Sequence, residues 1–285
     1  MNGNDDENSP YLVEIETVKN ATHIRNVLTA IKIQLQEVSL HITDEKMEIL
    51  QADPTHTVLV HLELFANEFH SYKCVMPNKI GLSLINIDKI LKCVAVDDSL
   101  TIFVEDPNYY NYDHTMTNPV GFLIHKHENS EIRKIRIRPI ETDEDPYKYP
   151  DLSFSSYEID MNAHKFSDIV GHLKTTGGEV VQIIYNKETL TMISKGESCE
   201  SEVTILRSSA DQYKMNIRRN NHNSDEHISI FVTLQKLVEF TKCTSLSENV
   251  TIYLNNNAPL VLSYRVGPLG TIKLGVASRP KPDDW

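Results

Sequence analysis

The chain has 285 residues, of which 40% are hydrophobic, so it is long enough for two domains with cores of their own. No apolar run approaches the ~20 residues that a membrane-crossing helix needs, and the acidic N-terminal stretch MNGNDDENSP is typical of neither a secretory signal nor a transit peptide. The formal net charge of −12 argues against a protein that binds nucleic acid over its whole surface, because such proteins carry a basic field.

Most of the sequence predicts short β-strands, rich in β-branched and aromatic residues and separated by Asn, Asp, Gly and Pro. Residues 132–138 alternate as a strand does, with Ile135 and Ile137 on one face and Arg136 and Arg138 on the other. The clearest of the other predicted strands are 57–64, 99–104, 120–125, 180–185, 227–232 and 260–266.

Four segments break the strand pattern because their apolar residues have helical spacing. The first runs from Ile24 with apolar residues at i, i+3, i+4 and i+7, and comparable stripes begin at Leu84, Phe166 and Leu234. Each segment follows a strand and precedes several more, so the order β-α-β-β-β occurs twice in each half and predicts an α+β fold of two similar domains. The predicted helices lie near residues 20–32, 83–95, 162–174 and 233–244.

The two halves are separated by residues 141–155, whose acidic run and prolines cannot continue a strand. This interdomain linker carries more apolar side chains than solubility requires, so they pack on the chain's own body, receive a partner, or do both. These side chains are Tyr147, Tyr149, Leu152 and Phe154. We expect an acidic flexible leader at 1–10, domains at 11–140 and 156–279, and a flexible tail at 280–285.

The predicted helices are basic although the chain is acidic. Residues 17–36 hold Lys19, Arg25 and Lys32 without any acid, and each of the other three helical segments has two lysines against one acid. Arg25 and Lys32 lie two turns apart on the face opposite the apolar stripe, as spaced phosphate contacts would. A merely solvated helix face would show the same pattern, so the charge alone leaves both interpretations open.

Motifs of the common enzyme classes are missing from the sequence. It has no G-x-S-x-G, P-loop, H-E-x-x-H or Gly-rich dinucleotide turn. His125 and His127 have no evident third metal ligand, and the acids of 141–145 are explained by a solvated linker. Widely spaced cysteines without a C-x-x-C pair favour a reducing compartment. We therefore expect an intracellular protein without catalytic residues, metal or cofactor.

Sequence blocks from both halves occur in the order found in one known family. They are Tyr72-Lys-Cys, Gly81-Leu-Ser-Leu, Asp88-Lys-Ile-Leu-Lys-Cys and Asp98-Ser-Leu-Thr-Ile, then residues 240–252, 258–264 and 270–273. Together with residues 51–60, which match the front loop that helps receive partner peptides, they resemble the proliferating cell nuclear antigen family of DNA sliding clamps. The resemblance covers about residues 11–279. It implies a homotrimeric ring, with outer antiparallel sheets and inner helices, that encircles duplex DNA.

The resemblance also implies partners and site residues. A clamp loader, DNA polymerase and other replication and repair proteins would dock through a short peptide with a one-turn helix and paired aromatics. The implied DNA-binding residues are Arg25, Lys32, Lys89, Lys92, Lys165 and Lys242. The implied partner-binding residues are His56, Leu59, Tyr149, Leu152, Pro259 and Ala277. The implied subunit interface pairs strand 132–138 with strand 202–207 through Ile135, Ile137, Val203 and Ile205.

Some positions depart from the family pattern. Asp168 and Gly171 stand where the family has arginines, so the third helix should contact DNA weakly. Ala52 stands where the family has a larger apolar residue, and Gly275 and Ser278 stand where it has a tyrosine and a proline. These differences predict a wider or differently shaped partner pocket. The Asn- and Tyr-rich divergence from the family and the ten-residue leader fit a clamp encoded by a large DNA virus. We expect the protein to act in the nucleus or, if it is viral, at a cytoplasmic replication site. A monomeric or heterotrimeric clamp-like processivity or checkpoint factor remains the alternative.

Overall fold

The computed structural model describes residues 9–110, 119–128, 130–142, 147–149, 151–152, 155–186, 189–206, 216–219, 227–256, 258–283 and 285. Phe154 of the linker and residues 1–8 of the leader lie outside these ranges. The chain divides into two compact units, the first from residues 1–51, 62–146 and 266–270 and the second from residues 52–61, 147–265 and 271–285. The segment 52–61 thus groups with the C-terminal half of the chain. The predicted domain limits remain predictions.

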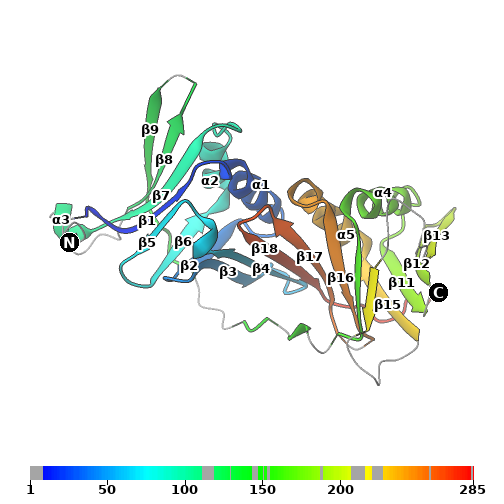
Figure 1. The fold of residues 1–285 in the computed structure, drawn as a ribbon. Helices are drawn as coiled ribbons and strands as arrows, with labels where there is room; N and C mark the ends of the chain where they lie inside the picture. Colours follow the sequence, from blue (N-terminus) through cyan, green and yellow to red (C-terminus); the bar gives the residue numbers. More distant parts are fainter. Residues whose placement is uncertain are drawn as a thin grey trace. The chain divides into compact units, whose positions relative to one another are not determined.

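The N-terminal half of the chain contains the predicted β-α-β-β-β repeat twice (Figure 1). The first copy is β1 (Tyr11–Thr17), α1 (Ala21–Ile31), β2 (Glu37–Ile42), β3 (Lys46–Ala52) and β4 (Val58–Phe65). The second is β6 (Asn78–Ser83), α2 (Leu84–Leu91), β7 (Ser99–Glu105), β8 (Val120–Lys126) and β9 (Glu131–Ile137). Short elements that the spacing did not predict are η1 (Ala66–Glu68), β5 (Ser71–Cys74) and α3 (Pro107–Tyr110).

The C-terminal half repeats the same order twice more, which confirms the predicted α+β fold of two similar halves. Its first copy is β10 (Tyr157–Asn162), α4 (Ala163–Lys174), β11 (Val180–Asn186), β12 (Thr189–Lys195) and β13 (Glu200–Leu206). The second, after the additional strand β14 (Asn216–Arg219), is β15 (His227–Thr233), α5 (Leu234–Phe240), η3 (Thr241–Leu246), β16 (Asn249–Leu254), β17 (Leu260–Val266) and β18 (Gly270–Val276).

Each unit contains a sheet that ends in an unpaired strand among the described residues. The first unit has the order β5-β1-β7-β8-β9, and the second has β13-β12-β11-β15. In both sheets the pairs next to the edge are antiparallel, with Phe122 opposite Ile135 and Met192 opposite Val203. The other strands form the runs β6-β2-β3-β4 and β14-β10-β16-β17-β18. β9 and β13 therefore offer free backbone edges.

The helices bury the apolar stripes that predicted them. On α1 the buried residues include Ile24 and Val27, and on α4 they include Phe166 and Leu173. Each such side chain stabilises the fold by about 1.5–3 kcal/mol when fully buried. The opposite faces stay accessible, which leaves the charged residues of α1 and α4 exposed or half-buried. No helix in the described part of the chain is long and apolar enough to span a membrane.

Helix boundaries have local causes. The side chain of Asn162 caps α4 by accepting a hydrogen bond from the backbone N–H of Lys165 at 3.0 Å. The fourth predicted helix, 233–244, is instead α5 followed by the 3₁₀ segment η3. At that junction the Thr241 hydroxyl donates to the carbonyl of Val238 at 2.7 Å, a bond that competes with regular helical geometry.

Candidate functional site

Helices α1 and α2 share a buried carboxylate between their basic residues. Asp88 is 4% exposed, and its Oδ2 lies 2.5 Å from Lys32 Nζ and 3.4 Å from Lys92 Nζ. Thr29 donates its hydroxyl to the other carboxylate oxygen at 2.9 Å. The hydrogen bond from Lys32 is the largest cause of the lowered pKa of Asp88. Two of the predicted DNA-binding lysines are thus partly neutralised by one acid.

Arg25 is also engaged within the first unit. Its Nη1 donates to the backbone carbonyl of Val94 at 2.5 Å, just beyond the C-terminal end of α2. A cation at this end of a helix interacts favourably with the carbonyl groups that the helix leaves unpaired. Arg25 therefore helps hold α1 against α2, and the more exposed cations of this face are Lys89 and Lys92.

In the second unit the predicted DNA-binding lysines are less constrained by acids. Lys242 is exposed on η3, and Lys165 is half-buried in the first turn of α4. The exposed side of α4 includes Asp168 and Gly171, the two departures from the family pattern. The exposed face of α4 is therefore less positively charged than the exposed face of α2 or of η3.

An apolar pocket of about 200 Å³ lies wholly in the second unit. Leu152, which sequence analysis predicted for the pocket, is not among the residues that line it, whereas the other predicted pocket residues are. The wall also includes Thr57 and Val58, which were not predicted individually but lie in the segment 51–60 that matches the front loop of the family. The full lining is Ala52, His56, Thr57, Val58, Leu59, Tyr147, Tyr149, Pro259, Gly275 and Ala277.

Linker tyrosines form one side of the pocket. Tyr147 Oη lies 2.6 Å from His56 Nδ1, and the Tyr149 ring lies 4.9 Å from the His61 ring, centre to centre. The Tyr149 hydroxyl is buried and has no hydrogen-bond partner among the described residues. Burial is the main cause of its raised pKa, so Tyr149 stays protonated at neutral pH and can donate to an incoming acceptor. Linker residues and the chain's own body therefore form the pocket together.

Two backbone features shape the pocket. His56 has a φ of 54°, a left-handed conformation that non-glycine residues adopt rarely and that clusters at functional sites. A Cβ on Gly275 would meet its nearest atoms at ordinary contact distances, 3.7 Å from the Leu59 carbonyl oxygen and 3.9 Å from Tyr149 Oη. Gly275 therefore leaves space that a larger residue would fill, which agrees with the predicted widening.

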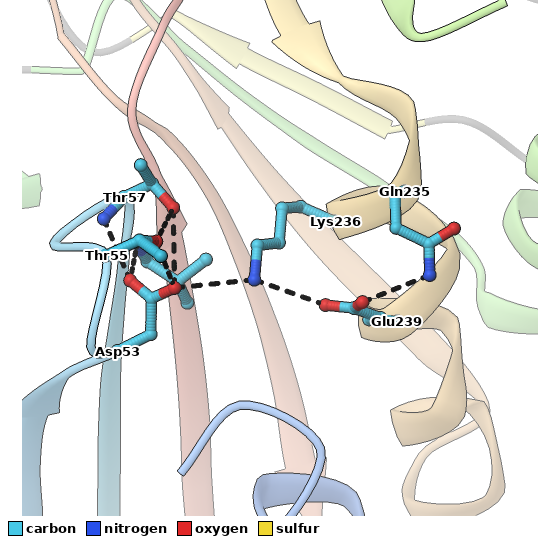
Figure 2. Close-up of polar contacts among 7 residues, drawn as sticks. Asp53, Thr55, Thr57, Gln235, Lys236 and Glu239 are labelled. Atoms are coloured by element: carbon cyan, nitrogen blue, oxygen red, sulfur yellow. Dashed lines mark hydrogen bonds and ion pairs between the residues drawn. The ribbon is translucent and has the colours of Figure 1, made fainter.

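An acid on the pocket loop meets a lysine from a helix. Figure 2 shows Asp53 on the loop before β4 and Lys236 on α5, joined by an ion pair. Lys236 Nζ lies 3.4 Å from Asp53 Oδ2. Lys236 Nζ lies equally far, 3.4 Å, from Glu239 Oε2. In the sequence, Lys236 stands out only as one charge of a basic helix. No local pattern signals its pairing, because Asp53 lies 183 positions away.

The predicted interface strands differ in burial. On β9, Ile135 and Ile137 are half-buried, whereas Ile132 is 62% exposed. On β13, Val203 is half-buried and Ile205 is buried, whereas Leu206 is 68% exposed. Both edge strands thus carry a large exposed apolar side chain that the sequence analysis did not select.

Comparisons with known proteins cover nearly the whole chain. The family model "Proliferating cell nuclear antigen, N-terminal domain" matches residues 12–145, and "Proliferating cell nuclear antigen, C-terminal domain" matches residues 148–279. A proliferating cell nuclear antigen of Dictyostelium discoideum is 29% identical over 261 residues, covering 92% of this chain and 96% of the relative. One of Chaetomium thermophilum is 24% identical over 272 residues, covering 94% and 98%.

The fold is also similar to a solved structure. The crystal structure of the Entamoeba histolytica proliferating cellular nuclear antigen superposes with a TM-score of 0.81 at 20% identity, over 95% of this chain and 100% of the other. At this identity the likeness concerns the fold alone.

Proposed function

Because the chain belongs to the proliferating cell nuclear antigen family of non-enzymatic DNA sliding clamps, we propose that its basic helices face duplex DNA while its apolar pocket binds partner proteins. A clamp keeps DNA polymerase at its template by remaining topologically linked to the duplex. The task of the DNA-facing surface is therefore to attract phosphates without fixing a position. The task of the pocket is to hold partners at that surface.

Sequence-independent contacts suit the lysines of α1, α2 and η3. Ammonium groups at Lys89 and Lys242 are exposed and can exchange between phosphates, which carry no base information. Lys92 is exposed as well, although Asp88 partly neutralises it. Lys32 and Arg25 contribute less than their charges suggest, because Asp88 and the Val94 carbonyl engage them. Lys165 contributes less to phosphate contact, because it is half-buried and the exposed face of α4 also carries Asp168. The remaining acidic surface repels DNA.

The apolar pocket is the observation that carries the partner-binding proposal. Its lining joins the end of β3, the loop before β4, the first residues of β4, the linker, Pro259 just before β17, and the end of β18. The pocket is open to an apolar anchor from outside. Aromatic side chains bury a large apolar area at little cost in conformational entropy, so paired aromatics on a one-turn peptide helix suit it. DNA polymerase, the clamp loader and repair proteins are the partners that we assign to it.

Ring closure by edge-strand pairing fits the two free sheet edges. β9 of one subunit would extend the sheet that ends in β13 of the next, so that every edge of this kind is paired. Ile135, Ile137, Val203 and Ile205 would then be covered further. Three copies would make a homotrimer, as in the family. The site of action would be the nucleus, or a cytoplasmic replication site if the protein is viral.

Primer extension on a circular template tests the proposal as a whole. With a matching loader and polymerase, the wild-type chain should lengthen the products made in one binding event. The double variant Lys89→Ala, Lys242→Ala should shorten these products while light scattering still gives three times the chain mass of 32.5 kDa. Unchanged product length in this variant would refute the DNA-facing role of the lysines.

A further inference from the structure

Asp53 organises the loop that forms one wall of the pocket. Its Oδ1 accepts hydrogen bonds from the backbone N–H groups of Thr57 and Val58, both at 2.8 Å. Its Oδ2 accepts the Thr55 hydroxyl at 2.6 Å. The Asp53 backbone closes the same turn, because its N–H donates to Val58 and its carbonyl accepts from His56, again at 2.8 Å. We call residues 53–58 the Asp53 loop.

The Asp53 carboxylate is 3% exposed, so it requires compensation for lost hydration. Burial by itself raises its pKa, but hydrogen bonds from Thr55, Val58 and Thr57 and the charge of Lys236 outweigh burial and lower it. Lys236 is the cation that the structure places against this carboxylate (Figure 2). Removing the ammonium would leave a nearly buried charge supported by hydrogen bonds alone.

Lys236 is held in place from its own helix as well. Glu239 lies one turn further along α5 and pairs with Lys236, and Gln235 Nε2 donates to the other Glu239 oxygen at 3.1 Å. The Lys236 side chain is 22% exposed, whereas Lys242 on the following segment η3 is exposed. Two lysines six positions apart thus have different surroundings, one between two carboxylates and one facing solvent.

The pocket depends on this arrangement because His56, Thr57 and Val58 line it. We propose that Lys236 is a positioning residue for partner peptides: it holds Asp53, and Asp53 holds the pocket wall. This assignment, which rests on the proposed partner-binding role of the pocket, gives Lys236 a role other than phosphate contact. It also means that α5 stabilises one wall of the partner pocket through the ion pair of Lys236 with Asp53.

Peptide affinity of matched lysine variants tests the assignment. The probe is a synthetic fluorescent peptide with a one-turn helix and paired aromatic residues, titrated into the full-length chain. Lys236→Met should weaken binding about fivefold to tenfold, a loss of about 1–1.4 kcal/mol. Lys236→Arg, which keeps the charge, should bind within about twofold of wild type. Lys242→Met should leave peptide affinity unchanged and lower retention on DNA.

Two further measurements separate positioning from general destabilisation. In Lys236→Met, amide hydrogen exchange should accelerate in residues 53–58 and stay unchanged in α4, which a loss of global stability would also affect. If Lys236 acts through Asp53, the double variant Asp53→Asn, Lys236→Met should bind no more weakly than Asp53→Asn alone. Additive losses, or unchanged exchange in the loop, would overturn the assignment.

Failure of the assignment can be told apart from failure of the proposed function. If wild type binds the peptide, Tyr149→Ala weakens binding and Lys236→Met does not, the pocket binds partners but Lys236 has no positioning role. If wild type does not bind the peptide at all, the pocket function and the role of Lys236 are both wrong. If Lys236→Met instead reduces DNA retention as much as Lys242→Met does, Lys236 is a phosphate contact and the assignment is wrong.

Discussion

Asp88 accepts a hydrogen bond from Lys32 across the contact between α1 and α2, with Oδ2 and Nζ 2.5 Å apart. The same oxygen lies 3.4 Å from Lys92, one helical turn along α2. A single acid therefore restrains two lysines on a face assigned to phosphate contact. It limits the strength of that contact and at the same time ties the two helices together. Weak, mobile contacts suit a clamp that must slide.

Replacing Asp88 should tighten DNA binding. In Asp88→Asn, Lys32 and Lys92 are no longer held by a carboxylate, so affinity for duplex DNA at low salt should rise about threefold, with a steeper dependence on salt. Anisotropy titrations at several salt concentrations measure both. Asp97→Asn is the matched control, because Asp97 is exposed and its substitution removes the same charge from a nearby position. An equal gain in both variants would show that only net charge matters.

The Asp88 contribution to stability should depend on pH in one direction. The carboxyl pKa is lower in the folded chain than in the unfolded chain, where it is about 4. Such a group stabilises the fold above that pH, and its contribution is lost as the pH falls through the folded-state pKa. The difference in free energy of unfolding between wild type and Asp88→Asn should shrink below about pH 4. A difference that grows on acidification would contradict the ion pairs.

Gly81 should be intolerant of any side chain. A Cβ at this position would lie 2.0 Å from the carbonyl oxygen of Ile140, whose N–H donates to Gly81 at 3.0 Å where the linker begins. Gly81→Ala should therefore reduce the free energy of unfolding by about 1–3 kcal/mol. Gly171→Ala is the control, since nothing lies within 4 Å on the exposed side of α4. It should stabilise the chain by about 0.5–1 kcal/mol. Thermal unfolding monitored by circular dichroism measures both, and equal effects would contradict the close approach.

Hydrophobic periodicity predicted the helices and strands, which depend on residues close together in the sequence. It did not predict ion pairs between residues that are far apart in the sequence. Apolar spacing from Ile24 located α1, because a helix on a sheet must bury one stripe. The pairing of Lys32 with Asp88 spans 56 positions, and that of Lys236 with Asp53 spans 183, so neither leaves a local pattern. The resemblance placed Tyr149 in the pocket, whereas Leu152 shows that position within a linker does not fix where a side chain packs.

The two linker residues should behave differently in peptide binding. Tyr149 lines the pocket and stacks beside His61, so Tyr149→Ala should weaken a paired-aromatic peptide about tenfold. Leu152 is absent from the lining, so Leu152→Ala should change affinity less than about twofold. Fluorescence anisotropy on both variants checks this, with circular dichroism as the test of folding. Equal losses would mean that the linker rearranges when the peptide binds.

Exposed apolar residues on the edge strands should control ring assembly. Ile132 on β9 and Leu206 on β13 are 62% and 68% exposed, more than a subunit interface would leave them if the edges pair. Ile132→Asp and Leu206→Asp should each place an uncompensated charge in that interface and dissociate the ring.

Light scattering on the purified variants gives the answer directly. Wild type at micromolar concentration should have three times the chain mass of 32.5 kDa, and either variant should approach the mass of one chain. Ile85→Asp serves as control, because Ile85 is 42% exposed on α2 and lies on no sheet edge. A monomeric wild type would exclude the homotrimer, whereas trimeric edge variants would move the interface away from β9 and β13.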